Sequence, residues 1–350
     1  SSKSTIGLLV ACLLPWPSHG AVTDIADKPL ASTSSDSVKP NIMFILDDSG
    51  SMELQFMPDP LDSRANTVGI RNGVCNTVFY NPALTYDTPQ TVVGTTTKTI
   101  EDINSASPTT FTSAYEDGYY AYTGRSLATY PRRNLETSFR AFQDNIFGEN
   151  RSYDTDVSDT AQPAYYWTYL GATTLVPVNG DCNKTLSSST DSTTKEYCTD
   201  GTRTTTTCAA AGKTALWRKT IVTGASGPGA TDERQNFANW YSYYRQRLTM
   251  MKSAAGKAFL GLGNKYRVGF VTINPGDPVS STRFLGVGEF TIDQKKLWIE
   301  KLYQQTDHGS TPLREALARV GSYYSGLNTG LSEGMIPAQA NDPVQYSCQQ

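Results

Sequence analysis

An aspartate and two serines alternate along the segment Asp47-Asp48-Ser49-Gly50-Ser51, directly after an apolar run. One carboxylate and two hydroxyls that converge on one point suit a hard divalent cation, because such ions prefer oxygen ligands. Mg²⁺ takes octahedral oxygen ligands at about 2.0–2.1 Å and keeps some of its waters. The simpler alternative is an Asp/Ser/Gly turn after a strand, which is common.

Thr311 is the candidate for a further protein ligand, because it precedes Pro312 in a loop that leads into a helical segment. The neighbour Asp48 is expected to point away from the ion. The four candidates carry too little negative charge to satisfy a divalent cation, so an acidic group from a partner could complete the shell. These candidate metal ligands are Asp47, Ser49, Ser51 and Thr311.

A buried strand must position the first three of these residues. Residues 42–46 form a continuous apolar run after Asn41, bounded by Pro40 and the Gly/Ser turn. Such a run is typical of a strand buried on both faces in the centre of a parallel sheet. In open α/β sheets, ligands bind at the carboxyl ends of strands of this kind.

The chain after residue 232 alternates predicted helices and strands. Asp232 and Gln235 form a capping-box pattern that opens an amphipathic helix of about 28 residues. Strands are predicted at 267–273 and 284–290, and helices at 293–305 and 313–324. This alternation predicts an α/β fold with a parallel sheet flanked by helices. Its first strand and first helix are separated by a long insertion.

The insertion, residues 53–232, has no long helical period and is rich in Tyr, Thr and Ser. Short aromatic or β-branched pieces alternate with turn signals, which predicts a β-rich segment. Its aromatic clusters could form an exposed binding surface, although rings that pack as cross-strand pairs explain them as well. The residues in question are Tyr119, Tyr120, Tyr122, Tyr165, Tyr166 and Trp167.

Residues 1–21 have the pattern of a secretory signal peptide: Lys3, a nine-residue apolar run at Ile6–Leu14, then small residues. The run is too short to span a bilayer, which takes about 20 residues. One alternative is a lipobox that anchors the chain at Cys12, and another is a buried N-terminal helix. Residues 22–39 are small and polar and are interpreted as a linker.

Export favours disulfide bonds. Five cysteines follow the signal peptide, so one would be free or would pair outside the chain. Metal binding by the cysteines is the alternative, but no CxxC pair occurs and the only histidine of the mature chain, His308, lies far away. The connectivity stays open among Cys75, Cys182, Cys198, Cys208 and Cys348.

Composition limits the function classes. The 350 residues carry a net charge of −3, and 38% of them are hydrophobic, which excludes wholesale disorder. The near-neutral balance without a Lys/Arg cluster argues against a nucleic-acid partner. No later stretch is long enough for a transmembrane segment. The length suits two domains, or one domain with a large insertion.

Several blocks resemble known proteins. Residues 44–52 resemble the metal-ion-dependent adhesion site of von Willebrand factor type A domains, and residues 309–313 resemble the loop that supplies its threonine. Residues 79–82, 84–86 and above all 236–245 resemble the type IV pilus tip-associated adhesins (PilY/PilC). The resemblance covers most of 40–350 and is weak across 90–215.

The resemblance implies a von Willebrand factor A-like (Rossmann-like) domain made of residues 40–52 and 233–350, with a mostly parallel sheet. It implies a metal site with Mg²⁺ as the usual ion and Mn²⁺ or Ca²⁺ as alternatives. The last acidic ligand, and the family's C-terminal propeller with its calcium site, would lie beyond Gln350, so the domain is expected to be truncated.

Family members are exported to the pilus tip or outer surface, where they prime pilus assembly and mediate adhesion and twitching motility. The implied partners are pilin subunits or minor pilins, and a host or abiotic surface ligand with an acidic group. One alternative is an exported type A binding protein unrelated to pili.

A subtilisin-like protease is a weaker alternative, because Asp48-Ser49-Gly50 and His308-Gly309-Ser310 echo the aspartate and histidine motifs of that class. No Gly-Thr-Ser nucleophile motif follows, so we expect a binding protein rather than an enzyme. His308 is then expected to be an exposed loop residue.

Overall fold

Three strands form the sheet that carries the candidate metal ligands. In this computed structural model, β1 spans Asn41–Leu46, β10 spans Arg267–Thr272 and β11 spans Phe284–Glu289, in the order β1-β10-β11. β1 and β10 run parallel, with Asn41 opposite Arg267 and Leu46 opposite Thr272. Two segments far apart in the sequence therefore end side by side at one edge of the sheet.

The structure describes residues 38–58, 61, 67–104, 108–123, 132–141, 161–172, 174, 180–184 and 193–335. Residues 39–350 cluster as one unit, to which every element described below belongs. The predicted signal peptide, Cys12, nearly all of the predicted linker, and Cys348 lie outside the described residues.

The fold is mixed α/β, and one strand pairing differs from the prediction. β11 is antiparallel to β10, so the expectation of parallel strands is confirmed for β1 and β10 and wrong for this pair. The link between Thr272 and Phe284 contains no helix, whereas parallel neighbours need a crossover of about a dozen residues or more.

β1 is less buried than its sequence predicts. Leu46 alone is fully buried, and the other five residues of the strand are half-buried. Within the described part of the chain β1 is bonded to β10 on one side only. The prediction of a strand buried on both faces in the middle of a sheet is therefore wrong for the residues described.

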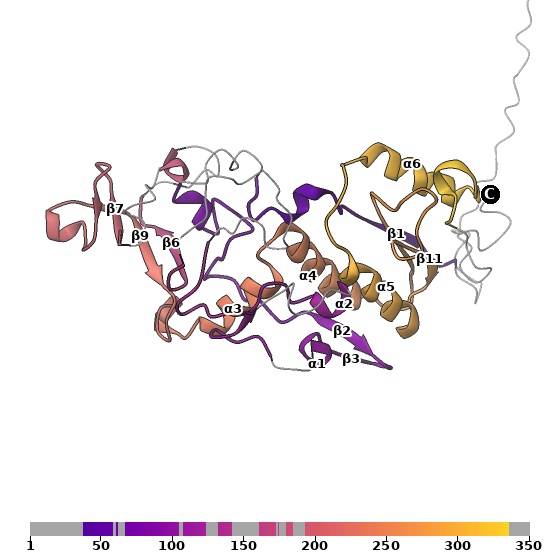
Figure 1. Ribbon diagram of the computed structural model, residues 1–350, viewed down its shortest axis with the longest axis horizontal. Coiled ribbons are helices and arrows are strands. Elements are labelled where there is room, and N and C mark those ends of the chain that lie inside the picture. Colours follow the sequence, from indigo (N-terminus) through magenta and orange to yellow (C-terminus); the bar gives the residue numbers. More distant parts are fainter. Residues whose placement is uncertain are drawn as a thin grey trace, which may run out of the picture. The chain divides into compact units, whose positions relative to one another are not determined.

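Helices cover both faces of the sheet. On one face, α4 (Arg247–Leu260) and α5 (Ile292–Gln304) pack on Val268 and Phe270, and the rings of Phe259 and Trp298 stack at 4.3 Å. On the other face, α6 (Leu313–Tyr324) packs on Val271. Figure 1 shows α6 and α5 on opposite sides of β1 and β11. The split follows from β geometry, because alternate side chains of a strand point to opposite faces.

The single long helix predicted after residue 232 is wrong. Two helices, α3 (Arg234–Tyr243) and α4, are separated by Tyr244, Arg245 and Gln246. Gln246 is extended (φ −116°, ψ 157°), and a reciprocal capping box with Thr249 makes it the N-cap of α4. The apolar spacing continues across this break, which is why periodicity alone did not reveal it.

The capping box predicted at the start of α3 is also wrong. The Asp232 carboxylate accepts hydrogen bonds from the backbone N–H and the guanidinium of Arg234. The Gln235 amide instead donates to the Thr109 carbonyl and to Asn239. Both side chains therefore form hydrogen bonds with other groups and do not cap the helix reciprocally.

Short strands and helices make up the described part of residues 53–232. β6-β9-β7-β8 form a four-stranded antiparallel sheet, and β2–β3 and β4–β5 are antiparallel pairs. The strands are β2 (Gln90–Val93), β3 (Thr96–Thr99), β4 (Ala114–Tyr115), β5 (Arg132–Arg133), β6 (Tyr165–Tyr169), β7 (Glu196–Cys198), β8 (Arg203–Thr204) and β9 (Ala215–Ile221). The α-helices are α1 (Glu101–Asn104) and α2 (Tyr120–Thr123), and the 3₁₀ turns are Gly69–Arg71, Gly180–Asn183, Ala209–Ala211 and Pro228–Ala230.

Four of the candidate cysteines form two disulfides. Cys75 pairs with Cys182, and Cys198 pairs with Cys208. All four side chains are fully buried. The first bridge ties two distant segments, and the second closes a short Thr-rich loop.

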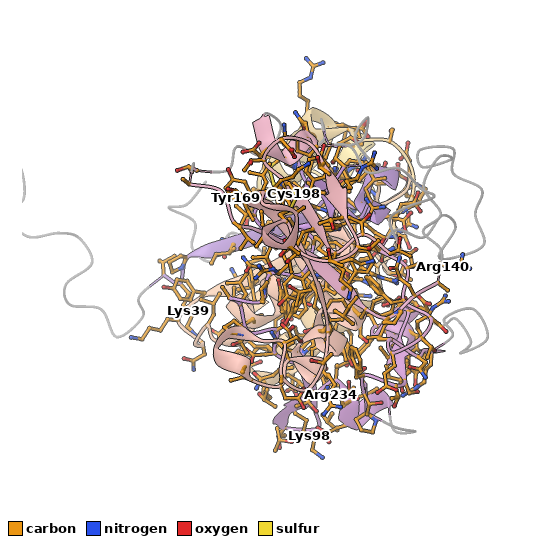
Figure 2. All side chains as sticks on the ribbon, turned by 90° about the vertical axis from the view of Figure 1, so that its left-hand side faces the viewer. Lys39, Lys98, Arg140, Tyr169, Cys198 and Arg234 are labelled. Carbon is orange, nitrogen blue, oxygen red and sulfur yellow. A yellow bond between two sulfur atoms is a disulfide. The ribbon has the colours of Figure 1, made fainter. Side chains whose placement is uncertain are left out.

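The proposed aromatic binding surface is not exposed. Tyr119, Tyr165, Tyr166 and Trp167 are at most 4% exposed, while Tyr120 and Tyr122 are half-buried. Three of the four buried rings belong to one large cluster, and Tyr119 belongs to the core beneath α4 and α5. Figure 2 shows the side chains of the described residues, with Lys98 at the lower edge of the view. For the four buried rings the surface alternative is wrong and the packing alternative fits, because they supply core in a segment that is otherwise rich in small polar residues.

None of the helices among the described residues has the length and apolar character needed to cross a bilayer.

Candidate metal centre

Three of the predicted ligands lie in one tight turn at the end of β1. The Ser49 backbone N–H donates to Asp47 Oδ1 at 2.9 Å, and the hydroxyl oxygens of Ser49 and Ser51 are 3.2 Å apart. Ser51 lies in the short 3₁₀ turn Gly50–Glu53, so the extended β1 chain coils at once. This coil brings alternate side chains to one side of the turn.

A second loop lies against this turn. The Gly50 N–H donates to the Gly309 carbonyl at 3.2 Å, and the His308 N–H donates to the Asp48 carbonyl at 2.7 Å. Thr311 is exposed and follows two residues after Gly309, directly before α6. The structure thus brings together the two loops that carry all four predicted ligands.

Gly309 is required where these loops touch. Its φ of +73° lies in the left-handed region, and a Cβ there would lie 2.9 Å from Asn274 Oδ1. A side chain at this position would strain the backbone and collide with a neighbour.

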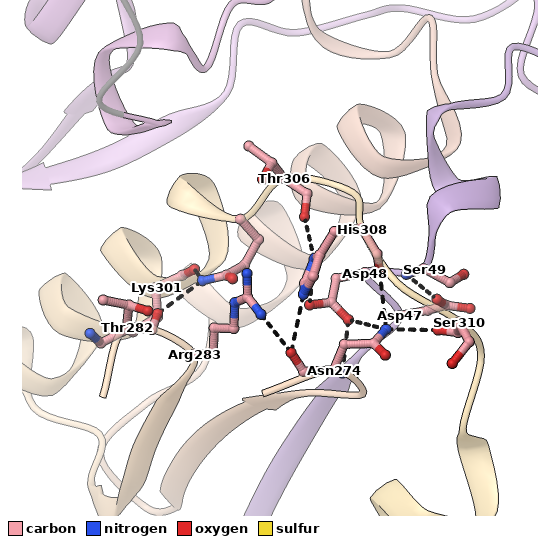
Figure 3. Close-up of polar contacts among 11 residues, drawn as sticks. Asp47, Asp48, Ser49, Asn274, Thr282, Arg283, Lys301, Thr306, His308 and Ser310 are labelled. Carbon is pink, nitrogen blue, oxygen red and sulfur yellow. Dashed lines mark hydrogen bonds and ion pairs between the residues drawn. The ribbon is translucent and has the colours of Figure 1, made fainter. Parts of the chain in front are cut away.

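Asp48 points away from the other candidates, as expected, and into the protein. Its carboxylate is fully buried, and Oδ1 accepts from the Asn274 N–H at 3.0 Å and from Asn274 Nδ2 at 3.1 Å (Figure 3). Oδ2 lies 3.5 Å from His308 Nδ1. Burial raises the pKa of Asp48, while His308 and the hydrogen bonds from Asn274 act in the opposite direction.

His308 is not the exposed loop residue that its sequence context predicted. Its side chain is 30% exposed, Nδ1 lies 3.3 Å from the Thr306 carbonyl, and Nε2 lies 3.2 Å from the Asn274 carbonyl. The structure therefore contains the Asp48–His308 pair that the protease alternative invokes. The second ring nitrogen, however, faces a backbone carbonyl instead of a serine hydroxyl.

Asn274 was missed by the sequence analysis. It lies just after β10, and its amide nitrogen also donates to the Ser310 carbonyl at 2.7 Å and approaches the His308 carbonyl at 3.3 Å. The available signal was a polar residue before Pro275-Gly276 at the carboxyl end of a predicted strand. Its importance depends on the parallel pairing of β1 with β10, which places it beside Asp48.

The arrangement fits a small, hard cation. Adjacent ligands of an octahedral ion with bonds of about 2.1 Å are about 3 Å apart, close to the 3.2 Å between the two serine hydroxyls. Among the described residues, no three His, Cys, Asp or Glu side chains are grouped as metal ligands. A cation at this turn would therefore depend on hydroxyl oxygens and the Asp47 carboxylate.

Comparisons with known proteins point to one kind of relative. The chain is 25% identical over 340 residues to the type IV pilus biogenesis factor PilY1 of Pseudomonas aeruginosa strain PAK, a match that covers 94% of this chain and 24% of that protein. It is 26% identical over 346 residues to PilY1 of strain UCBPP-PA14, covering 98% and 25%. No protein-family model and no solved structure matches. The chain spans about a quarter of the length of these curated relatives, and over that length it is homologous to the PilY1 pilus biogenesis factors.

Proposed function

We propose that this chain is the metal-binding adhesion region of an exported type IV pilus biogenesis protein. The observation that carries the proposal is the meeting of the Asp47–Ser51 turn with the Gly309–Thr311 loop, in a chain homologous to PilY1 over nearly its whole length. We assign Asp47, Ser49, Ser51 and Thr311 as the protein ligands of Mg²⁺, with Mn²⁺ or Ca²⁺ as alternatives.

The surrounding architecture supports a von Willebrand factor A-like domain built from residues 40–52 and 233–350. β1 pairs in parallel with β10, and helices cover both faces of the sheet. The ligand loops lie at the carboxyl ends of strands, where α/β sheets place ligands. Residues 53–232 then form an insertion between the first strand and α3.

A bound divalent cation would supply positive charge for holding an acidic group of a partner. The net charge at the ion depends on the carboxylates that reach it. Asp47, which is half-buried, is the single carboxylate among the four proposed ligands. The Asp48 carboxylate is turned inward and bonds to Asn274 instead. Among these four ligands one carboxylate leaves net positive charge on a divalent ion, so an acidic group beyond Gln350 or on a partner would complete the shell. We therefore propose binding rather than catalysis as the activity.

We place the protein at the pilus tip or on the outer cell surface. The proposed partners are pilin or minor pilin subunits, together with an acidic group on a host or abiotic surface. Adhesion, pilus assembly and twitching motility would all depend on this exported region.

The test is complementation of cells that lack the protein. Wild type and Asp200→Ala, an exposed carboxylate in the Cys198–Cys208 loop, should restore surface pili, attachment and twitching. Asp47→Ala should fail in attachment or assembly although the variant is exported and folded. Normal pili and attachment in cells without the protein would overturn the proposal. Normal pili with lost attachment would instead indicate an exported type A binding protein unrelated to pilus assembly.

A further inference from the structure

Asn274 touches both loops of the proposed metal site without belonging to either. Its backbone N–H and its Nδ2 both donate to Asp48 Oδ1, at 3.0 and 3.1 Å. The same Nδ2 donates to the Ser310 carbonyl at 2.7 Å. One amide group therefore joins the end of β1 to the loop that leads to Thr311 (Figure 3).

Asn274 is itself held from a third direction. Its carbonyl accepts a hydrogen bond from Arg283 Nη1 at 2.8 Å and lies 3.2 Å from His308 Nε2. Arg283 directly precedes β11, so the backbone of Asn274 is tied to the sheet as well as to the loops.

The Ser310 carbonyl and the Asp48 carboxylate belong to segments that are far apart in the sequence. Only non-covalent contacts therefore hold them close together. Two backbone bonds, from Gly50 to the Gly309 carbonyl and from His308 to the Asp48 carbonyl, complete the contact. Gly309 packs so closely on Asn274 that a Cβ would lie 2.9 Å from Oδ1. The contact between the loops is thus centred on this one side chain.

We propose that Asn274 is a positioning residue that holds the Thr311 loop against the Asp47–Ser51 turn and so sets the affinity of the site for its cation. The inference rests on the metal site put forward under Proposed function. Asn274 acts through Ser310 and Asp48 and makes no bond to the ion. Loss of a residue that orients metal ligands without binding the ion typically lowers metal affinity by about 10–100-fold.

The test compares Asn274→Ala and Asn274→Asp with wild type, and with Asn134→Asp as a matched control. Asn134 is exposed, and its side-chain oxygen accepts a hydrogen bond from the nearby Glu136 N–H, so an aspartate preserves that contact. Asn274→Asp keeps the shape but removes the Nδ2 donor and places a second carboxylate against Asp48. We expect calorimetric Mn²⁺ and Mg²⁺ affinity to fall about 10–100-fold in Asn274→Ala and further in Asn274→Asp.

A second readout needs no metal. In the metal-free chain, the amide hydrogens of Gly50 and His308 should exchange faster in Asn274→Ala, because they bridge the loops. Amides within β10, such as that of Phe270, should exchange as in wild type, which a general loss of stability would not allow. Unchanged exchange at Gly50 and His308, or unchanged affinity, would overturn the inference.

The two proposals fail in different ways. A wild-type chain that binds neither ion would refute the metal site, whereas the exchange experiment would still decide whether Asn274 joins the loops. Binding by wild type that is undiminished in both Asn274 variants would leave the metal site standing and refute the positioning role.

Discussion

Glu116 and Arg245 form an ion pair of 2.9 Å in which neither side chain is more than 2% exposed. Arg245 lies in the break between α3 and α4, and Glu116 follows β4 in the segment that precedes them. Arg133 and the Tyr241 hydroxyl bond to the same carboxylate. The break in the predicted long helix is therefore fixed by a buried charge network that involves a distant part of the chain.

We expect Arg245→Ala to lower the free energy of unfolding by about 3 kcal/mol, because removing one partner leaves a buried charge poorly compensated. Arg133 still faces Glu116, which keeps the loss at the low end of the usual range. The measurement is urea unfolding followed by circular dichroism.

The matched control is Lys257→Ala. Lys257 and Asp87 form an ion pair of similar length, 2.8 Å, but their side chains are 75% and 56% exposed. Such pairs contribute less than about 1 kcal/mol because solvent screens them. Equal losses in the two variants would show that burial of the Glu116 pair does not matter.

The same network predicts a pH dependence of stability. Burial tends to raise the pKa of Glu116, but Arg245, Arg133 and the Tyr241 hydroxyl outweigh it and hold the pKa below its ordinary value. Because the folded-state pKa lies below the unfolded one, the stabilisation is fully present above about pH 4.5 and is lost as the pH falls through the folded-state value.

The check is urea unfolding of wild type and Glu116→Gln at neutral and acidic pH. Glu116→Gln should be less stable than wild type at pH 7, and its stability should fall less on acidification. A variant whose stability falls as steeply as that of wild type would exclude Glu116 as a source of acid sensitivity.

Much of the fold follows from local patterns. The apolar runs predict β1, β10 and β11, and the 3.6-residue period with Pro312 predicts α5 and α6 almost to the residue. The break at Arg245 could not be predicted, because Tyr244 and Leu248 keep the apolar spacing across it while its cause lies at Glu116. The antiparallel β11 was predictable in principle, since no helix fits between Thr272 and Phe284.

The part of the candidate site that lies in one short segment after a strand was predictable from the sequence. The part that comes from a distant segment was not, because only the folded chain brings it to the site. Asp47, Ser49 and Ser51 share one short turn, so their spacing was informative. Asn274 is a single polar residue in a Pro/Gly turn, and it gains its role only when β10 pairs with β1. The sequence pattern around Tyr165 and Trp167 was ambiguous. An aromatic cluster in a polar segment can form either the core of that segment or its surface, and both side chains are buried.

The two disulfides should differ in their contribution to stability. Cys75–Cys182 spans 107 residues and Cys198–Cys208 spans 10. On the chain-entropy estimate, paired Ser substitutions should cost about 5 kcal/mol for the long loop and about 3 kcal/mol for the short one. Thermal unfolding of the two double variants checks this. A larger loss for the Cys198–Cys208 variant would contradict the order.

The proposed function depends most directly on divalent-cation binding by the turn after β1. Calorimetric titration of the purified chain with Mg²⁺ and Mn²⁺ tests it directly, comparing wild type with Asp47→Ala, Ser49→Ala and the control Asp200→Ala. We expect saturable binding by wild type and Asp200→Ala, and loss of binding in Asp47→Ala and Ser49→Ala with unchanged unfolding midpoints. Absence of binding in wild type, or undiminished binding in both site variants, would contradict it.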